Sequence, residues 1–194
     1  PQLAERPGKL VEAIDAIRGR FPTSLIWTPG IGGPDNCALL SWMGVDLFDL
    51  SRSREAVARG VILTEDGPRE PESTAGEISD LQTQLEAWKR ALGATRSAIR
   101  EGTIRQLAER QALSSPRSVE RLRRHDSIMS EKASVDAGSA GLESVIKEGN
   151  RLLCHSYTSR NDPLIREWRR RVSQVHTPPP HQSKVLVLLP CSAK

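Results

Sequence analysis

A glycine-rich segment and a carboxylate follow two successive apolar stretches of this 194-residue sequence. Residues 29–32 (Pro-Gly-Ile-Gly) come after the apolar stretch 23–28, and Asp49 comes after the apolar stretch 45–48. Glycines let a flat ligand lie close to the backbone, and a carboxylate can attack an anomeric carbon or stabilise positive charge on a ribose. A carboxylate at such a place also often caps a helix, so the residue types alone leave both roles open for Asp49.

The elements around these residues alternate between helix and strand. The pattern predicts a helix at 10–17, a strand at 23–28, a helix from Asp35 or Asn36 to Trp42, and a strand at 45–48. This order is typical of an α/β fold with a parallel sheet or barrel. Because the βα loops of a barrel gather at one face, the glycine segment and Asp49 are expected at the same face.

The rest of the chain predicts mainly helices. The expected elements are a helix at 54–59, an extended run at 61–64, a loop at 68–73, a helical region at 74–110 broken at Gly93 and Gly102, a helix from Pro116, a loop at 134–141, a strand at 151–157 and a basic helix at 164–175. Three consecutive prolines mark a linker at 176–183. We therefore expect one unit at 1–175 and the start of a following α/β domain at 184–194, with a strand at 185–189.

Composition excludes several classes of protein. Hydrophobic residues make up 37% and charged residues 27%, as in soluble globular proteins, and the longest apolar run is far too short to span a membrane. Cys37, Cys154 and Cys191 are widely separated, which argues against a disulfide framework and for a reducing, cytoplasmic setting. No histidine has cysteine or carboxylate neighbours at metal-ligand spacing, so no metal is expected. The first residue, Pro1, and the strand-like end predict an internal piece of a longer protein.

The net charge of +4 and the pI of about 9.3 fit an anionic partner such as nucleic acid. Two arginine clusters could supply the contacts, since an arginine-rich helix face can follow the phosphates of an RNA backbone. The candidate RNA-binding residues are Arg121, Arg123, Arg124, Arg166, Arg169 and Arg170. A solvated helix face would give the same pattern.

The stretch Gly30-Ile31-Gly32-Gly33-Pro34-Asp35, followed at a similar spacing by Gly44-Val45-Asp46-Leu47-Phe48-Asp49, resembles the tRNA-guanine transglycosylase family, the queuine and archaeosine tRNA-ribosyltransferases. The resemblance implies the C-terminal part of a (β/α)₈ barrel, followed by a helical region and the first strand of a following domain. It implies a deazaguanine pocket at the glycine loop and the position of the nucleophile on ribose C1′ for Asp49. The substrate-binding residues that it implies are Gly30, Ile31, Gly32, Asp46 and Ser192.

One departure from the family indicates a divergent member. The family usually holds a structural zinc ion with a CxCxxC cluster downstream of the nucleophile. This chain has no cysteine between Cys37 and Cys154, so that zinc site is absent and no cofactor is expected.

The C-terminal residues 185–194 resemble the start of the PCSxxKPYSxSxSH motif of the archaeosine synthase branch. The resemblance implies attack on a nitrile, with glutamine or lysine as the amine donor. A thiolate could add to the nitrile carbon and form a thioimidate that an amine then displaces, so Cys191 is a candidate nucleophile. Cys191 could instead be a small buried hydrophobic residue at the end of a strand.

Together, these resemblances imply a tRNA-modifying enzyme of archaeosine biosynthesis. Its reaction would convert 7-cyano-7-deazaguanine at position 15 of archaeal tRNA to an amidine. One alternative is an active transglycosylase that exchanges guanine for a 7-deazaguanine through Asp49. The other is a tRNA-binding subunit without chemistry of its own. The expected partners are tRNA and the amine donor. A second copy of the chain is a further candidate partner, and no membrane is expected.

Overall fold

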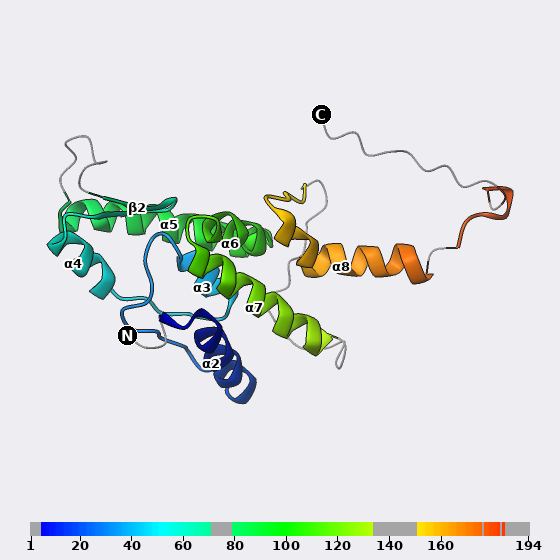
Figure 1. The fold of residues 1–194 in the computed structure, drawn as a ribbon, viewed down its shortest axis with the longest axis horizontal. Helices are drawn as coiled ribbons and strands as arrows, with labels where there is room; N and C mark the ends of the chain where they lie inside the picture. The colour runs from blue at the N-terminus through cyan, green and yellow to red at the C-terminus, as the bar shows by residue number, and fades with distance from the viewer. Residues whose placement is uncertain (1–4, 71–78, 134–150, 176, 183, 185–194) are drawn as a thin grey trace.

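The computed structural model describes residues 5–70, 79–133, 151–175, 177–182 and 184. These residues are mostly helical with one small sheet (Figure 1). The α-helices are α2 (Pro7–Arg20), α3 (Cys37–Trp42), α4 (Ser51–Ala58), α5 (Leu81–Glu101), α6 (Ile104–Ala112), α7 (Pro116–Ala133) and α8 (Pro163–Arg170). Shorter helical turns are η2 (Tyr157–Asn161), η3 (Arg171–Val175, a π-helix) and η4 (Pro180–Gln182). Strands β1 (Ile62–Thr64) and β2 (Gly67–Arg69) pair antiparallel, with Leu63 opposite Pro68.

The short helix α3 lies at the centre of the core. All six of its residues are buried, and Leu39 and Leu40 have no exposed surface. Helices α2, α5, α6 and α7 lie around it (Figure 1). A helix of this length is unstable alone, so its formation depends on this tertiary packing.

The helix predictions are largely confirmed, with one error. Helices α2, α3, α4 and α7 lie where they are expected, and Gly102, at a φ of 72°, ends α5 in the left-handed conformation. The predicted break at Gly93 is wrong, because α5 continues through it. Gly93 lies on the exposed side of α5, opposite the buried stripe that includes Ala87, Ala91 and Thr95, so the packing that holds the helix does not involve it.

The strand predictions are only partly met. Residues 23–28 and 45–48 meet in one isolated parallel bridge, Trp27 with Leu47, and the Ile26 carbonyl accepts from the Asp46 and Leu47 amides at 2.9 and 3.1 Å. The described residues thus form a small antiparallel sheet among helices and contain no barrel. The loop expected at 68–73 begins inside β2.

The strand expected at 151–157 is also wrong. Residues 151–155 have no regular structure, and η2 begins at Tyr157. The Ser156 side chain accepts from the Thr158 amide and forms a capping box with Ser159, which favours a helical turn over a strand.

Several predictions lie outside the described residues. These are the loop at 134–141, the strand at 185–189 and nearly all of the unit expected at 184–194. Of the linker expected at 176–183, residues 177–182 are described and end in η4. No helix in the described part of the chain is both long enough and apolar enough to cross a membrane.

Candidate functional site

The carboxylate of Asp49 lies where the two motif segments meet. Its Oδ2 accepts hydrogen bonds from the Gly30 amide and from Trp27 Nε1, both at 3.0 Å. Its Oδ1 accepts from the Ser51 amide at 2.7 Å, at the start of α4. The side chain is half-buried. The glycine loop and Asp49 are therefore in direct contact, as expected for groups at one face.

The hydrogen bonds also determine the charge of this group. Partial desolvation raises the pKa of Asp49, but the hydrogen bonds from Ser51, Gly30 and Trp27 outweigh it and leave the pKa lowered. Asp49 is therefore an ionised carboxylate at neutral pH. It can stabilise a developing positive charge or act as a nucleophile, and its bond to Ser51 is also that of a residue capping a helix.

Asp46 has a different set of partners. Its Oδ2 accepts from the Ile26 amide at 2.8 Å and from Arg18 Nη2 at 2.6 Å. Arg18 also donates to the Pro22 and Ser24 carbonyls at 2.9 Å and to the Gly44 carbonyl. The contacts of Asp46 thus join the end of α2 to the two segments that carry the motif.

Two amide side chains, those of Asn36 and Gln111, form hydrogen bonds that fix the backbone of the glycine loop. Asn36 Oδ1 accepts from the Gly33 amide at 2.8 Å, and its Nδ2 donates to the Ile31 carbonyl at 3.1 Å. Gln111 of α6 donates to the Pro34 carbonyl at 3.1 Å and accepts from the Ala38 amide at 2.9 Å. The loop therefore has a fixed shape, and its φ of +70° at Gly30 is one that glycine adopts readily.

Two glycines of the loop have no room for a side chain. A Cβ at Gly32 would lie 2.5 Å from Cδ1 of Phe48, and one at Gly33 would lie 2.4 Å from Asp35 Oδ1. Phe48 packs against Trp88, with ring centroids 5.7 Å apart. The glycines therefore allow close packing as well as any close approach of a ligand.

Replacing Gly32 by alanine is expected to reduce the free energy of unfolding by about 1–3 kcal/mol, because Phe48 must move away from its packing position. The matched control is Gly93→Ala. A Cβ at Gly93 would meet nothing within 4 Å, and alanine in place of a helical glycine should stabilise by about 1 kcal/mol. Urea denaturation of both variants measures the difference. Equal stability of the two would contradict the close packing at Gly32.

The arginines proposed to bind RNA differ in their surroundings. In α7, Arg121 is buried, Arg123 is exposed, and Arg124 pairs with Glu12 of α2 at 2.8 Å. In α8 the three arginines are exposed: Arg166, Arg169 and Arg170. The arginines of α7 therefore do not form a continuous exposed basic surface, because Arg121 is buried and Arg124 is ion-paired.

Of the other candidate residues, Cys191 and Ser192 lie outside the described residues. Ile31 is half-buried and Gly32 is buried, both within the loop. Cys37 is buried in α3 with its Sγ 3.5 Å from Thr95 Oγ1, and burial raises the pKa of its thiol. Cys37 is therefore a packing residue, whereas Cys154 is exposed.

A second cluster of charged residues was not identified from the sequence. Arg105 of α6 has no exposed surface and donates to Glu109 at 2.9 Å, to Asp126 of α7 at 2.8 Å and to the Thr158 carbonyl at 3.2 Å. Ser156 and Ser159 each donate to Glu109 at 2.6 Å. We call Arg105, Glu109, Asp126, Asp162, Ser156 and Ser159 the buried charge cluster; it joins α6, α7 and η2. In the sequence, Arg105 and Glu109 have the i, i+4 spacing of an ordinary surface pair.

Two carboxylates of this cluster, Glu109 and Asp126, pair with the Arg105 guanidinium, and a third, Asp162, interacts with it only electrostatically. Burial raises the pKa of Asp126 to about 6; Arg105 opposes the rise, while Asp162 and Glu109 add to it. The neighbouring His125, buried against Trp42 with ring centroids 5.8 Å apart, has its pKa lowered to about 4, chiefly by desolvation. Acid therefore has opposite effects on stability through these two adjacent groups. Proton uptake by Asp126 favours the folded chain, whereas proton uptake by His125 favours the unfolded chain.

Replacing His125 by phenylalanine should make the protein more resistant to acid. Because the folded-state pKa lies below the ordinary 6.5, only the unfolded chain takes up this proton between pH 6.5 and 4, and stability falls as the pH falls through that window. The variant should gain about 3 kcal/mol relative to the wild type between pH 7 and pH 4. Asp126→Asn is the control of opposite sign, since a raised pKa gives stability that is lost as the pH rises through about 6. A stability difference between His125→Phe and the wild type that does not change with pH would contradict the expectation.

Within the residues that the structure describes, no group of three or more histidine, cysteine, aspartate or glutamate side chains is placed to hold a metal ion. Comparison of the chain with protein-family models, with curated proteins and with solved structures finds no match. The described residues therefore define only a general architecture. They form a mostly helical structure with a small two-stranded sheet and a half-buried carboxylate at the glycine loop.

Proposed function

We propose that this protein is a tRNA-modifying enzyme of the transglycosylase-like family and that it is most similar to the archaeosine synthase branch. One observation carries the proposal. The Gly30 amide donates to the Asp49 carboxylate, so the two halves of the motif that resembles the family meet at one place. A helix cap alone would require only the contact with Ser51.

We also propose that the segments 23–28 and 45–48 belong to a (β/α)₈ barrel whose other strands come from elsewhere in the protein. Ile26 and Val45 are buried, whereas Leu25, Trp27 and Leu47 are 69%, 57% and 47% exposed. Parallel strands in α/β folds are apolar on both faces because both faces are covered. The exposed apolar face and the parallel bridge between Trp27 and Leu47 support a barrel interior on that side.

In the proposed reaction the base is already in the tRNA, so no glycosidic bond has to break. The nitrile carbon of 7-cyano-7-deazaguanine is attacked by a thiolate, for which Cys191 is the candidate, and the amine of glutamine or lysine then displaces the sulfur. Asp49 and the glycine loop would hold the base. The fixed shape of the loop, held by Asn36 and Gln111, suits a binding site for a flat ring.

The test is mass spectrometry of tRNA that carries 7-cyano-7-deazaguanine after incubation with the protein and either amine donor. The proposal expects the mass of the nucleoside to increase by that of the donor. Failure of both donors on a tRNA that the protein binds would overturn it.

A transglycosylase is the second candidate, favoured by the ionised, half-buried Asp49. In the same assay with labelled free base, it would incorporate label into unmodified tRNA and leave the nitrile unchanged. A binding subunit without chemistry would bind tRNA and give neither product.

Helix α8 is the proposed contact with the tRNA backbone. Its three arginines are exposed. Trp168 of the same helix is 64% exposed and could stack on an unpaired base. Arg169→Glu/Arg170→Glu should weaken tRNA binding and reduce the slope of log K against log salt by about 2, one for each lost phosphate contact. Unchanged affinity at low salt would show that α8 is only a solvated helix.

A further inference from the structure

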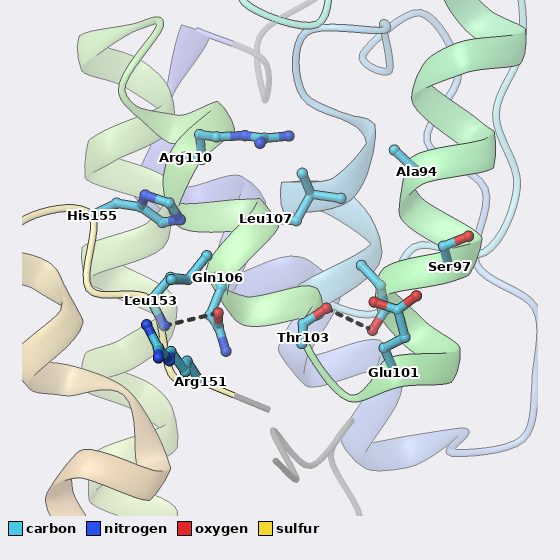
Figure 2. A pocket seen from close by; sticks show the side chains of 11 residues that line it. Ala94, Ser97, Glu101, Thr103, Gln106, Leu107, Arg110, Arg151, Leu153 and His155 are labelled. Atoms are coloured by element: carbon cyan, nitrogen blue, oxygen red, sulfur yellow. Dashed lines mark hydrogen bonds between the residues drawn. The ribbon is translucent and has the colours of Figure 1, made fainter. Parts of the chain in front are cut away.

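The structure contains a pocket of about 470 Å³ between α5, α6 and residues 151–155 (Figure 2). This size lies within the usual range for small-molecule sites, roughly 300–1,000 Å³. The pocket is separate from Asp49, which does not line it, and no part of the proposed function uses it.

One side of the pocket is lined by basic side chains. Arg110 of α6 lines it together with Arg151 and His155, and Figure 2 shows the three side chains on the same side. All three are exposed to solvent. Among the described residues, no ion pair or side-chain hydrogen bond engages Arg110, Arg151 or His155. Two guanidinium groups and an imidazole without a carboxylate partner form a site for an anion.

A buried amide gives a second, independent indication of a ligand. Gln106 lines the pocket and is only 5% exposed. Its Oε1 accepts from the Leu153 amide at 3.0 Å, which determines the orientation of the group, because only the oxygen can accept. Its Nε2 is buried and donates to nothing among the described residues. A buried donor without an acceptor is unfavourable, and an oxygen of a ligand would satisfy it.

The opposite side of the pocket limits the choice of ligand. Glu101 and Ser97 of α5 lie there (Figure 2). Ala98 and Leu107 form an apolar part of the lining. A carboxylate facing the basic groups across the pocket disfavours an extended polyanion. The donors on the basic side outnumber the two oxygens of a carboxylate and suit the three terminal oxygens of a phosphate monoester.

We infer that this pocket binds the terminal phosphate of a small molecule, through Arg110, Arg151, His155 and Gln106. The apolar lining and Glu101 receive the rest of the ligand. This inference does not depend on the proposed tRNA chemistry.

The experiment titrates the 194-residue chain with inorganic phosphate, then with glycerol phosphate, by calorimetry at constant ionic strength. Saturable binding at one site is expected. Arg110→Gln and Arg151→Gln should each weaken it about tenfold, the effect of losing one hydrogen bond between charged groups. Gln106→Glu keeps the acceptor for Leu153 and removes the donor, so it should also lose binding.

The matched control is Arg96→Gln, which makes the same charge change at an exposed position of α5 that does not line the pocket. It should bind phosphate as the wild type does. Absence of saturable binding, or equal weakening in Arg96→Gln, would overturn the inference. So would a short RNA that binds through Arg110 and Arg151 while free phosphate does not compete, since the site would then be a contact for an RNA backbone.

Discussion

Replacing Arg105 by methionine is expected to reduce the free energy of unfolding by about 3–5 kcal/mol, the usual effect of removing one partner from a buried ion pair. Arg105 has no exposed surface, and its guanidinium donates to Glu109 and Asp126. Methionine fills much of the same volume but leaves two buried carboxylates facing each other without a cation. Denaturation by urea, monitored by circular dichroism, measures the change.

Two further variants separate the charge effect from a general effect of substitution. Arg123→Met, at an exposed position of α7, should change stability by less than about 0.5 kcal/mol. Adding Asp126→Leu to Arg105→Met removes one stranded carboxylate and should recover part of the loss. If the double variant is as unstable as the sum of the single ones, the buried charge cluster does not act as a unit.

Replacing Cys191 by alanine is expected to stop amidine formation, with a rate loss of about 10³-fold or more, as for other nucleophiles in covalent catalysis. In the proposed reaction the thiolate forms a C–S bond to the nitrile carbon and the nitrogen takes up a proton. Attack by the amine then breaks the C–S bond and releases the thiolate. Alanine can form no such bond. The matched control, Cys154→Ala at an exposed cysteine, should retain activity.

Asp49→Asn distinguishes the two proposed chemistries. If Asp49 only helps to hold the base, the asparagine variant should still form amidine, with weaker binding of the tRNA. If Asp49 attacks ribose C1′, the same variant should lose base exchange almost completely. Retained turnover in Cys191→Ala would rule out the thiolate, and the proposed function would then require another nucleophile.

The sequence predicted the helices better than the extended segments. Helical periodicity is local, so α2 and α7 could be identified from their own apolar residues. A strand depends on neighbours that are distant in sequence, and the stretch at 23–28 has one bridge among the described residues. The strand prediction at 151–157 fails for a related reason. Ser156 can begin a helical turn, and the Leu153 amide donates to Gln106, which belongs to a helix distant in sequence.

One feature of the candidate site agrees with the sequence prediction, since the glycine loop and Asp49 are expected at one face and the Gly30 amide donates to Asp49. The roles of these residues in binding or catalysis stay predictions. The bond between Asp46 and Arg18 could not be foreseen, since these residues lie far apart in the chain. The buried charge cluster was missed because burial of Arg105 depends on α7 and η2, and no local pattern marks it.

The hydrogen bond between Trp27 and Asp49 gives the candidate site its own optical reporter. The indole of Trp27 is 57% exposed and donates directly to the carboxylate, whereas Trp42 and Trp88 are 6% and 4% exposed in the core. Indole fluorescence depends on the polarity around the ring, so a molecule that occupies the glycine loop changes the emission of Trp27 while the core tryptophans stay constant. With Trp168 replaced, binding at this site could be followed in a fluorimeter without any label.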